Sequence, residues 1–186
     1  MLSDPLSVYQ RLRDERRREV EALTRRADQV SKLRLVTFLA GSALAWGAVS
    51  GGWLSVWWLG VPVVVFIGLV VAHNRLLPDR DRVTRSVAWY EHGIARIEDR
   101  WSGLGSRGDR FLDADHLFAQ DLDLFGEGSL FQLLNTAQTQ TGEETLATWL
   151  QTPVDRVEIT ARQEAVRDLL SRLTLRERLA TLVAAK

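Results

Sequence analysis

The sequence predicts an all-α protein in which a two-span helical hairpin crosses a membrane and cytoplasmic helices lie on both sides of it. From Leu35 to Ala72 the chain runs for 38 residues without a formally charged side chain. One helical span needs about 20 mostly apolar residues, so this run accommodates two spans if the chain turns midway. Ser50-Gly51-Gly52 is a turn signal at that point. No segment shows a convincing strand-like alternation of apolar and polar residues.

The expected spans cover about residues 33–49 and 53–72. The second span is rich in valine, leucine and isoleucine, each of which favours insertion by about 0.3–0.6 kcal/mol near the bilayer centre, so it should insert unaided. The first span is diluted by small and polar residues. It is therefore expected to pack against the second span, through Ala40, Ala43 and Gly47 at helical spacing.

Pro62 lies inside the second expected span and removes a backbone donor, which a local kink or a packed partner accommodates. Tryptophans flank the turn, where indole rings favour the level of the lipid headgroups. These tryptophans are Trp46, Trp53, Trp57 and Trp58.

Basic residues stand on both sides of the apolar run, and the turn carries none. They are Arg25, Arg26, Lys32 and Arg34 before the run and Arg75, Arg80, Arg82 and Arg85 after it. Because basic residues stay on the cytoplasmic side of a membrane, both termini are expected to be cytoplasmic. The alternative is a soluble protein with two buried helices, but such a protein would place 38 of its 186 residues in a charge-free core.

Composition excludes several classes of protein. The formal net charge is zero, so the chain has no excess of basic residues of the kind that nucleic-acid-binding proteins carry. Cysteine is absent, which excludes disulfides, thiol catalysis and cysteine-ligated metals. The mean hydropathy is close to zero only because a strongly apolar middle is averaged with charged flanks.

Four segments are expected. Residues 1–34 form an amphipathic juxtamembrane helix, which lies on anionic headgroups, presents a solvated face or pairs with itself as a coiled coil. Residues 35–72 are the transmembrane hairpin. Residues 73–116 contain a second helix, over about 76–99, and a glycine-rich linker, and residues 117–186 form a helical part.

The helical part contains four capping-box patterns, in which a side chain at the helix start accepts from a backbone N–H three residues later. The patterns are Ser129-x-x-Gln132, Thr141-x-x-Glu144, Asp155-x-x-Glu158 and Thr174-x-x-Glu177. They predict helices near residues 130–138, 142–151, 156–171 and 175–184.

The order of motifs in this part resembles the beginning of the helical core domain of the MutS family. The residues that carry the resemblance are Asp121 to Asn135, Thr139, Thr141-Gly142, Leu146, Trp149-Leu150, Pro153, Ile159, Arg162-Gln163 and Ala165-Val166. The hairpin and residues 101–116 further resemble a membrane-anchored bacterial branch of MutS-related proteins. The resemblance covers most of the chain and is strongest over residues 117–168. It implies a multi-pass protein of the bacterial inner membrane.

The resemblance implies that the parent protein is a DNA-repair-type ATPase that binds mismatched or otherwise structured DNA. The sequence contains no Gly-x-x-x-x-Gly-Lys-[Ser/Thr] loop, so we expect this chain not to be an enzyme and to bind no cofactor. ATP and Mg²⁺ are expected only for a full-length parent. The chain ends at Ala184-Ala185-Lys186 in or just after a predicted helix, as a truncated gene or an excised N-terminal portion would. Phe125-Gly126-Glu127 matches the family's mismatch-reading Phe-x-Glu wedge in spelling only, because it lies in the core motif.

We assign no catalytic, cofactor-binding or metal-binding residue. One acidic cluster could hold a divalent cation, but its spacing matches no EF-hand or zinc pattern, and loop solvation and capping explain it better. The cluster is Asp113, Asp115, His116, Asp121 and Asp123. His73 and His92 have no neighbouring nucleophile to activate. We expect three glycines to lie in turns, in backbone conformations that a Cβ would oppose: Gly126, Gly128 and Gly142.

Arg162 and Gln163 have two open interpretations. The resemblance places them at the start of a core helix that makes interdomain contacts. A surface salt bridge from Arg162 to Glu158 or Glu164 explains the arginine equally well.

The leading functional hypothesis is the N-terminal anchor and core fragment of a MutS-like protein, acting in tethering and positioning. Its expected partners are the lipid bilayer, a second copy of the chain, a downstream ATPase module, and DNA only through a full-length parent. The alternative is a stand-alone membrane adaptor that recruits a cytoplasmic protein. A small enzyme at the membrane surface has no supporting cluster of residues.

Overall fold

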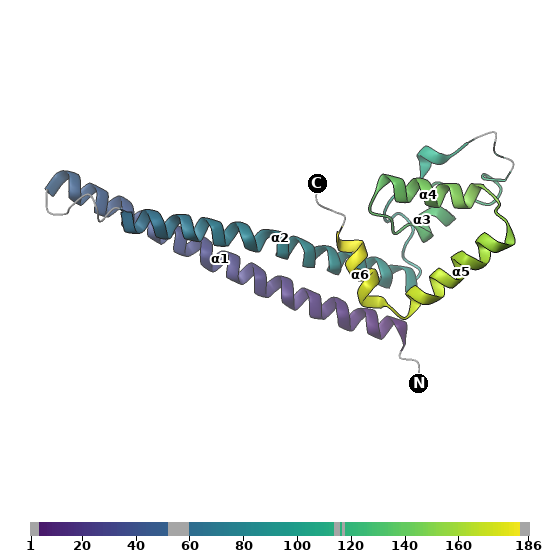
Figure 1. The fold of residues 1–186 in the computed structure, drawn as a ribbon, viewed down its shortest axis with the longest axis horizontal. Helices are drawn as coiled ribbons and strands as arrows, with labels where there is room; N and C mark the ends of the chain where they lie inside the picture. The colour runs from purple at the N-terminus through teal and green to yellow at the C-terminus, as the bar shows by residue number, and fades with distance from the viewer. Residues whose placement is uncertain (1–3, 52–59, 114–115, 117, 183–186) are drawn as a thin grey trace. The chain divides into compact units, whose positions relative to one another are not determined.

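The computed structural model describes residues 4–51, 60–113, 116 and 118–182. Within these ranges the chain is all-α and has no strand, as predicted. The elements are α1 Pro5–Gly51, α2 Gly60–Ile97, the 3₁₀ helix η2 Asp109–Phe111, α3 Leu130–Leu134, α4 Gln140–Gln151, α5 Arg156–Leu170 and α6 Leu173–Leu182 (Figure 1). Residues 15–84 form one compact unit, and residues before 15 and after 84 form the other.

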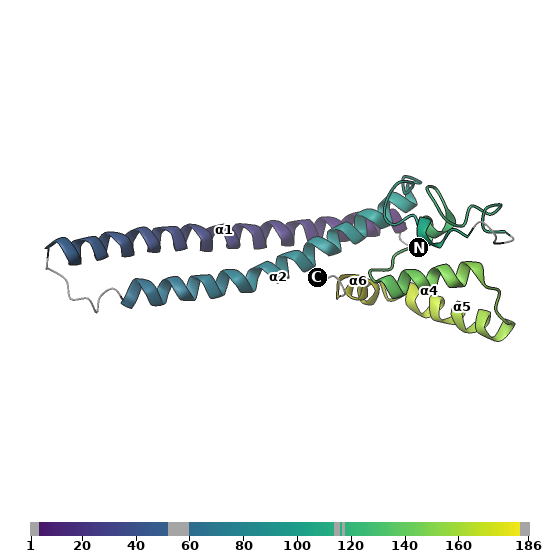
Figure 2. The same cartoon turned by 90° about the horizontal axis from the view of Figure 1, so that it is seen from above.

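Within the first unit, α1 and α2 run side by side in opposite directions (Figures 1 and 2). They approach closely at Gly41, where an added Cβ would lie 3.3 Å from Cβ of Pro62. The rings of Phe38 and Phe66 lie beside this contact, with centroids 6.4 Å apart. The prediction that Ala40, Ala43 and Gly47 form the contact is therefore wrong. Both alanines are exposed, and a Cβ on Gly47 would meet no atom within 4 Å.

The helical hairpin exposes most of its apolar side chains. Among the described residues, α2 is the one helix that is long and apolar enough to cross a membrane, with a window of mean hydropathy 1.8 and no buried residue in it. This helix contains the described part of the second expected span. The first span, residues 33–49, is not confirmed and stays a prediction. Trp46 is 77% exposed, whereas Gly52, Trp53, Trp57 and Trp58 lie outside the described residues.

Pro62 packs against α1, which is one of the two predicted alternatives, because a Cβ built on Gly41 would lie 3.3 Å from Cβ of Pro62. α2 is described from Gly60 onward, and residues 52–59 lie outside the described part of the chain. The helix also continues through Pro78, so the expected helix over residues 76–99 is the continuation of the span rather than a separate element.

The second unit contains a small aromatic core. Phe131 is fully buried, and its ring centroid lies 5.5 Å from those of both Phe111 and Phe125. The other buried residues of this cluster are Ala119, Leu124 and Ala147. Backbone hydrogen bonds join the loops around this core. In one of them, the N–H of Phe131 donates to the carbonyl of Leu124 at 3.0 Å. The core therefore fixes a region that is mostly loop.

The N-cap hydrogen bond is present in two of the four predicted capping boxes, whereas Gln132 Oε1 accepts from the N–H of Gly128 at 2.8 Å and Glu158 Oε1 accepts from Arg162. Ser129 Oγ accepts from the N–H of Gln132 at 3.2 Å, and Asp155 Oδ1 accepts from the N–H of Glu158 at 2.8 Å. The Thr141 box is wrong, because α4 begins two residues earlier and Thr139 is its cap. The Thr174 box is also wrong, since α6 already begins at Leu173. The helix predicted near residues 130–138 is shorter in the structure, where α3 ends at Leu134.

Replacing the cap of α5 tests this assignment. We expect Asp155→Ala to destabilise the start of α5 by about 1 kcal/mol, because it leaves the N–H of Glu158 without its acceptor. Amide hydrogen exchange over residues 156–160 measures the loss. Thr174→Ala is the matched control, and it should leave exchange in the first turn of α6 unchanged. Equal protection in the Asp155 variant and the parent chain would contradict the cap.

Candidate functional site

A cavity of about 560 Å³ lies in the second unit, among the start of α1, the last three turns of α2, the helix α6 and the loop over residues 135–139. Its lining is basic and aromatic. The basic side chains are those of Arg85, Arg96 and Arg176, and the aromatic ones are those of Tyr9 and Trp89. The cavity is a candidate site because three arginines converge on it from two helices.

Helical spacing explains how α2 supplies its side of the cavity. Arg85, Trp89, His92 and Arg96 follow one another at steps of four, three and four residues, and such steps place side chains on one face of a helix. All four residues line the cavity. The α6 helix supplies Arg176 to the same cavity.

The three arginines donate to neutral oxygens. Arg96 Nη2 donates to the carbonyl of Asn135 at 2.7 Å, and Arg85 Nε donates to the carbonyl of Thr181 at 3.3 Å. Arg176 Nη2 contacts the hydroxyl of Tyr9 at 3.5 Å, which is at the limit of a hydrogen bond. Within the described part of the chain, none of the three guanidinium groups forms an ion pair with a carboxylate.

Burial lowers the pKa of Arg96 below its ordinary value, and the electrostatic interaction with the Tyr9 phenol partly opposes this effect. Desolvation disfavours the charged form of a guanidinium group. Arginine nevertheless stays protonated in proteins. The shift therefore marks Arg96 as a partly dehydrated cation, which interacts more strongly with an anion than a solvated one does.

The aromatic wall is well packed. The ring of Trp89 stacks on Tyr9 at a centroid distance of 5.9 Å and meets Tyr90 edge-on at 4.9 Å. Gly93 lies beneath Tyr9, and a Cβ at this position would collide with the tyrosine ring. Glycine at position 93 thus allows α1 to lie close against α2.

A buried hydrogen bond connects α2 with α6. The hydroxyl of Tyr90 donates to Oε2 of Glu177 at 2.8 Å, and the two residues are 1% and 5% exposed. Glu177 therefore stabilises the packing of α6, instead of closing the capping box that the sequence predicted for it. The bond helps to hold Arg176, the preceding residue, at the cavity.

Removing this hydroxyl should loosen α6. We expect Tyr90→Phe to cost about 1–3 kcal/mol, because it withdraws a donor from a buried carboxyl group. Denaturant unfolding of the full chain, followed by hydrogen exchange over residues 173–182, measures the change. Tyr9→Phe is the control, since among the described residues the Tyr9 hydroxyl has one hydrogen-bond partner, Arg176, at the long distance of 3.5 Å. Equal stability of the two variants would show that the Tyr90 hydrogen bond does not hold α6.

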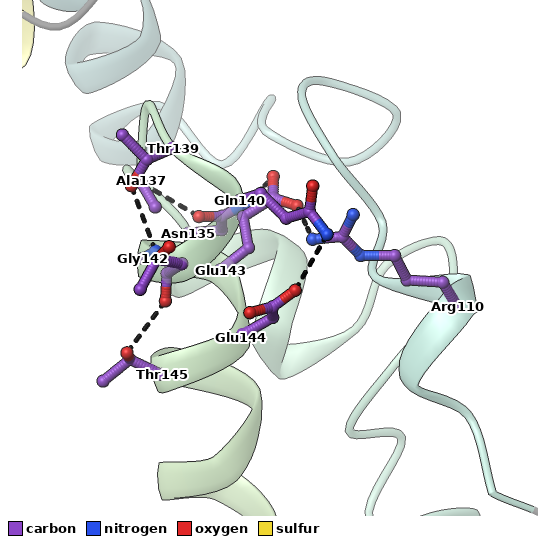
Figure 3. A network of polar contacts seen from close by, with 10 residues as sticks. Arg110, Asn135, Ala137, Thr139, Gln140, Gly142, Glu143, Glu144 and Thr145 are labelled. Atoms are coloured by element: carbon purple, nitrogen blue, oxygen red, sulfur yellow. Dashed lines mark hydrogen bonds and ion pairs between the residues drawn. The ribbon is translucent and has the colours of Figure 1, made fainter.

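Polar contacts fix the loop at the cavity edge (Figure 3). Glu143 lines the cavity, but its carboxylate pairs with Arg110 at 2.9 Å and accepts from Asn135 Nδ2 at 3.1 Å. The Asn135 side chain in turn accepts from the N–H of Ala137 at 3.0 Å. Thr139 Oγ1 accepts from the N–H of Gly142 at 3.1 Å and so closes the start of α4. The one acidic residue in the cavity lining is therefore already engaged.

The acidic cluster does not form a metal site among the described residues, which contain no group of three His, Asp or Glu side chains able to hold a metal ion. His116 Nε2 lies 3.2 Å from the carbonyl of Gln151, and its ring meets Phe118 edge-on at 4.5 Å. Asp123 adopts a left-handed turn conformation, with φ at 47°. Asp115 lies outside the described residues. His116 and Asp123 therefore have local structural roles.

Arg162 has the structural role that the sequence analysis considered. Its Nε donates to Oε1 of Glu158 at 2.7 Å, and its guanidinium group lies 4.1 Å from the centre of the Trp149 ring. The arginine thus ties α5 to the end of α4. Gln163 is exposed.

Two of the three expected turn glycines have the predicted conformation. Gly126 and Gly128 have φ values of 111° and 74°, in the region that glycine favours. The prediction for Gly142 is wrong, because this residue lies in the first turn of α4. A Cβ at this position would approach Cβ of Ala137 to 3.0 Å, so a larger residue would make the neighbouring loop shift by a few tenths of an ångström.

Sequence reasoning did not assemble the cavity. It counted Arg85 only among the charges that orient the hairpin, and it found no nucleophile next to His92 in the sequence. The four-three-four spacing from Arg85 to Arg96 was the available signal, because it puts two arginines and an aromatic residue on one helix face. Arg176 and Tyr9 could not be added to that face without the tertiary structure.

Comparison with known proteins gives one match, to a family model. No curated protein and no solved structure matches the chain. Residues 116–185 match the family model of MutS domain III. The match confirms the predicted resemblance over this part of the chain and supports a MutS-related family.

Proposed function

We propose that this chain is the membrane-anchored N-terminal part of a MutS-like protein, in which the hairpin tethers the domain III-like region to the cytoplasmic face of the inner membrane. The proposal rests chiefly on the match of residues 116–185 to MutS domain III in a chain that also contains the apolar helix α2. The anchor would keep any DNA- or ATP-binding module of the same protein close to the bilayer.

The surface of the hairpin supports a lipid environment. Large apolar side chains are exposed along both of its helices, and soluble monomers rarely expose so large a contiguous patch. On α1 they are Leu33, Leu35, Val36, Phe38, Leu39, Leu44 and Trp46, and on α2 they are Val61, Val63, Val64, Val65, Ile67 and Val71. Hydrocarbon would cover this surface, whereas water would leave it without partners.

Thiol labelling tests the proposed topology. The chain has no cysteine, so Ser50→Cys and Ser171→Cys each introduce a single thiol. Ser50 was expected in the turn but lies in the last turn of α1, which ends at Gly51, and Ser171 follows α5. In intact cells, an impermeant maleimide should label Cys at position 50 and not at position 171, and both should react after the membrane is opened. Labelling of both positions in intact cells, or recovery of the chain in the soluble fraction, would contradict the anchor.

The ATPase part of the proposal requires a separate module. The sequence has no phosphate-binding loop, so ATP and Mg²⁺ would bind to residues outside it. Reading the encoding locus beyond codon 186 tests this point. We expect a phosphate-binding loop in frame or in the neighbouring gene, and an unrelated intact gene there would favour the adaptor role instead.

A further inference from the structure

We propose that the cavity among α1, α2 and α6 binds a small anion that carries phosphate groups, through the guanidinium groups of Arg85, Arg96 and Arg176. The inference is independent of the proposed membrane anchoring, because every residue that lines the cavity belongs to the second compact unit.

The size and the charge of the cavity fit such a ligand. Its volume is about 560 Å³, and small-molecule sites commonly measure about 300–1,000 Å³. The charged lining residues are three arginines and one glutamate, which gives a formal charge of 3 − 1 = +2. Since the glutamate, Glu143, pairs with Arg110, the three arginines are left without an acidic partner in the described chain.

The arginines retain unused donors. Each guanidinium group has five N–H donors, and each of these three makes one hydrogen bond within the described chain. A planar fork of donors matches two oxygens of one phosphate group. Thr139, the N-terminal cap of α4, also borders the cavity, so the positive end of this twelve-residue helix adds to the attraction.

The aromatic wall disfavours a ligand that needs to stack. Trp89 is the largest ring in the lining, but Tyr9 and Tyr90 already pack against it. A base or another flat ring would compete with Tyr9 for the ring face that the tyrosine already covers. The site therefore favours recognition through phosphate oxygens alone, as in a diphosphate or a phosphomonoester group.

Two of the arginines also have a structural role, which guides the choice of variant. Arg85 donates to a carbonyl in the last turn of α6, and Arg96 donates to the carbonyl that ends α3. Substitution at either position would disturb these helix ends. Arg176 makes only its 3.5 Å contact with Tyr9 and lies 5.8 Å from the Trp89 ring centre. Arg176→Gln is therefore the informative change.

Titration calorimetry of the full chain in a neutral detergent, with inorganic pyrophosphate as the probe, tests the proposal. We expect saturable binding that Arg176→Gln weakens by about tenfold, since it removes charge-assisted hydrogen bonds. Arg178→Gln is the matched control, because Arg178 is exposed on the same helix and does not line the cavity. It should bind pyrophosphate as the parent chain does.

Three results would overturn the proposal. They are the absence of saturable binding by the parent chain, an equal loss in the Arg176 and Arg178 variants, and equal affinity for pyrophosphate and acetate. The second would show general charge attraction, and the third would show no preference for phosphate geometry. Circular dichroism of both variants verifies that α6 is still formed.

The same titration in lipid nanodiscs distinguishes a lipid headgroup from a soluble phosphate compound as the ligand. The chain is placed in nanodiscs of phosphatidylcholine with either phosphatidic acid or phosphatidylglycerol, which are both anionic. If a lipid phosphomonoester fills the cavity, phosphatidic acid weakens pyrophosphate binding more than phosphatidylglycerol does. If the ligand is a soluble phosphate compound, the two lipids act alike. Either result supports the site, provided that Arg176→Gln weakens the binding by about tenfold.

Discussion

Gly108→Ala should destabilise the second unit by about 2–5 kcal/mol. Gly108 has a φ of 73°, and a Cβ built on it would lie 2.6 Å from Cδ1 of Phe131 and 3.0 Å from Cδ1 of Phe125. The left-handed conformation costs a residue with a Cβ about 1–2 kcal/mol, and overpacking a core adds about 1–3 kcal/mol. Phe131 is fully buried, and a contact of 2.6 Å forces either its ring or the backbone at Gly108 to shift.

Gly105→Ala separates the cost of the left-handed conformation from the cost of overpacking the core. Gly105 also has a φ of 73°, but a Cβ there would meet no atom within 4 Å, so only the conformational cost of about 1–2 kcal/mol remains. Denaturant unfolding gives both values, and hydrogen exchange at the N–H of Phe131, which donates to Leu124, locates the damage in the core. Equal losses in the two variants would contradict the proposed clash with the aromatic rings.

Local signals in the sequence predicted the elements better than their contacts. Ser129 and Asp155 cap helices as predicted, because a cap depends on residues within one turn of itself. The Thr141 and Thr174 boxes failed for a different reason, since in each case the helix gained an earlier start. At Thr141 a second hydroxyl two residues upstream was available as the cap, and no rule of spacing chooses between the two.

Contacts between distant segments required the structure. The close approach at Gly41 and Pro62 depends on how α1 and α2 rotate against each other, which small residues at helical spacing do not determine. Tyr9, Arg96 and Arg176 all line the cavity, although more than 160 residues of chain separate Tyr9 from Arg176. Glu177 shows the same effect, because its partner Tyr90 lies on a helix 87 residues away.

Val64→Arg should remove the chain from the membrane. Val64 is 70% exposed on α2, near the middle of the expected second span. An arginine near the centre of a span costs about 2.5–3.5 kcal/mol of insertion free energy, which is about a hundredfold in an equilibrium. In cells carrying the Ser50→Cys background, we expect less protein to sediment with membranes after an alkaline wash. The thiol at position 50 should then escape labelling from outside.

Val157→Arg is the matched control for Val64→Arg, because it places the same charge on an exposed valine outside the expected spans. Val157 is 78% exposed at the start of α5, outside the expected spans, so its replacement by arginine should leave membrane sedimentation and labelling unchanged. In water, both valines are exposed helical positions, and arginine would be tolerated at either one. In lipid, only the Val64 variant has to bury a charge. Equal behaviour of the two variants would therefore show that water, or a protein partner with room for the charge, surrounds the hairpin instead of hydrocarbon.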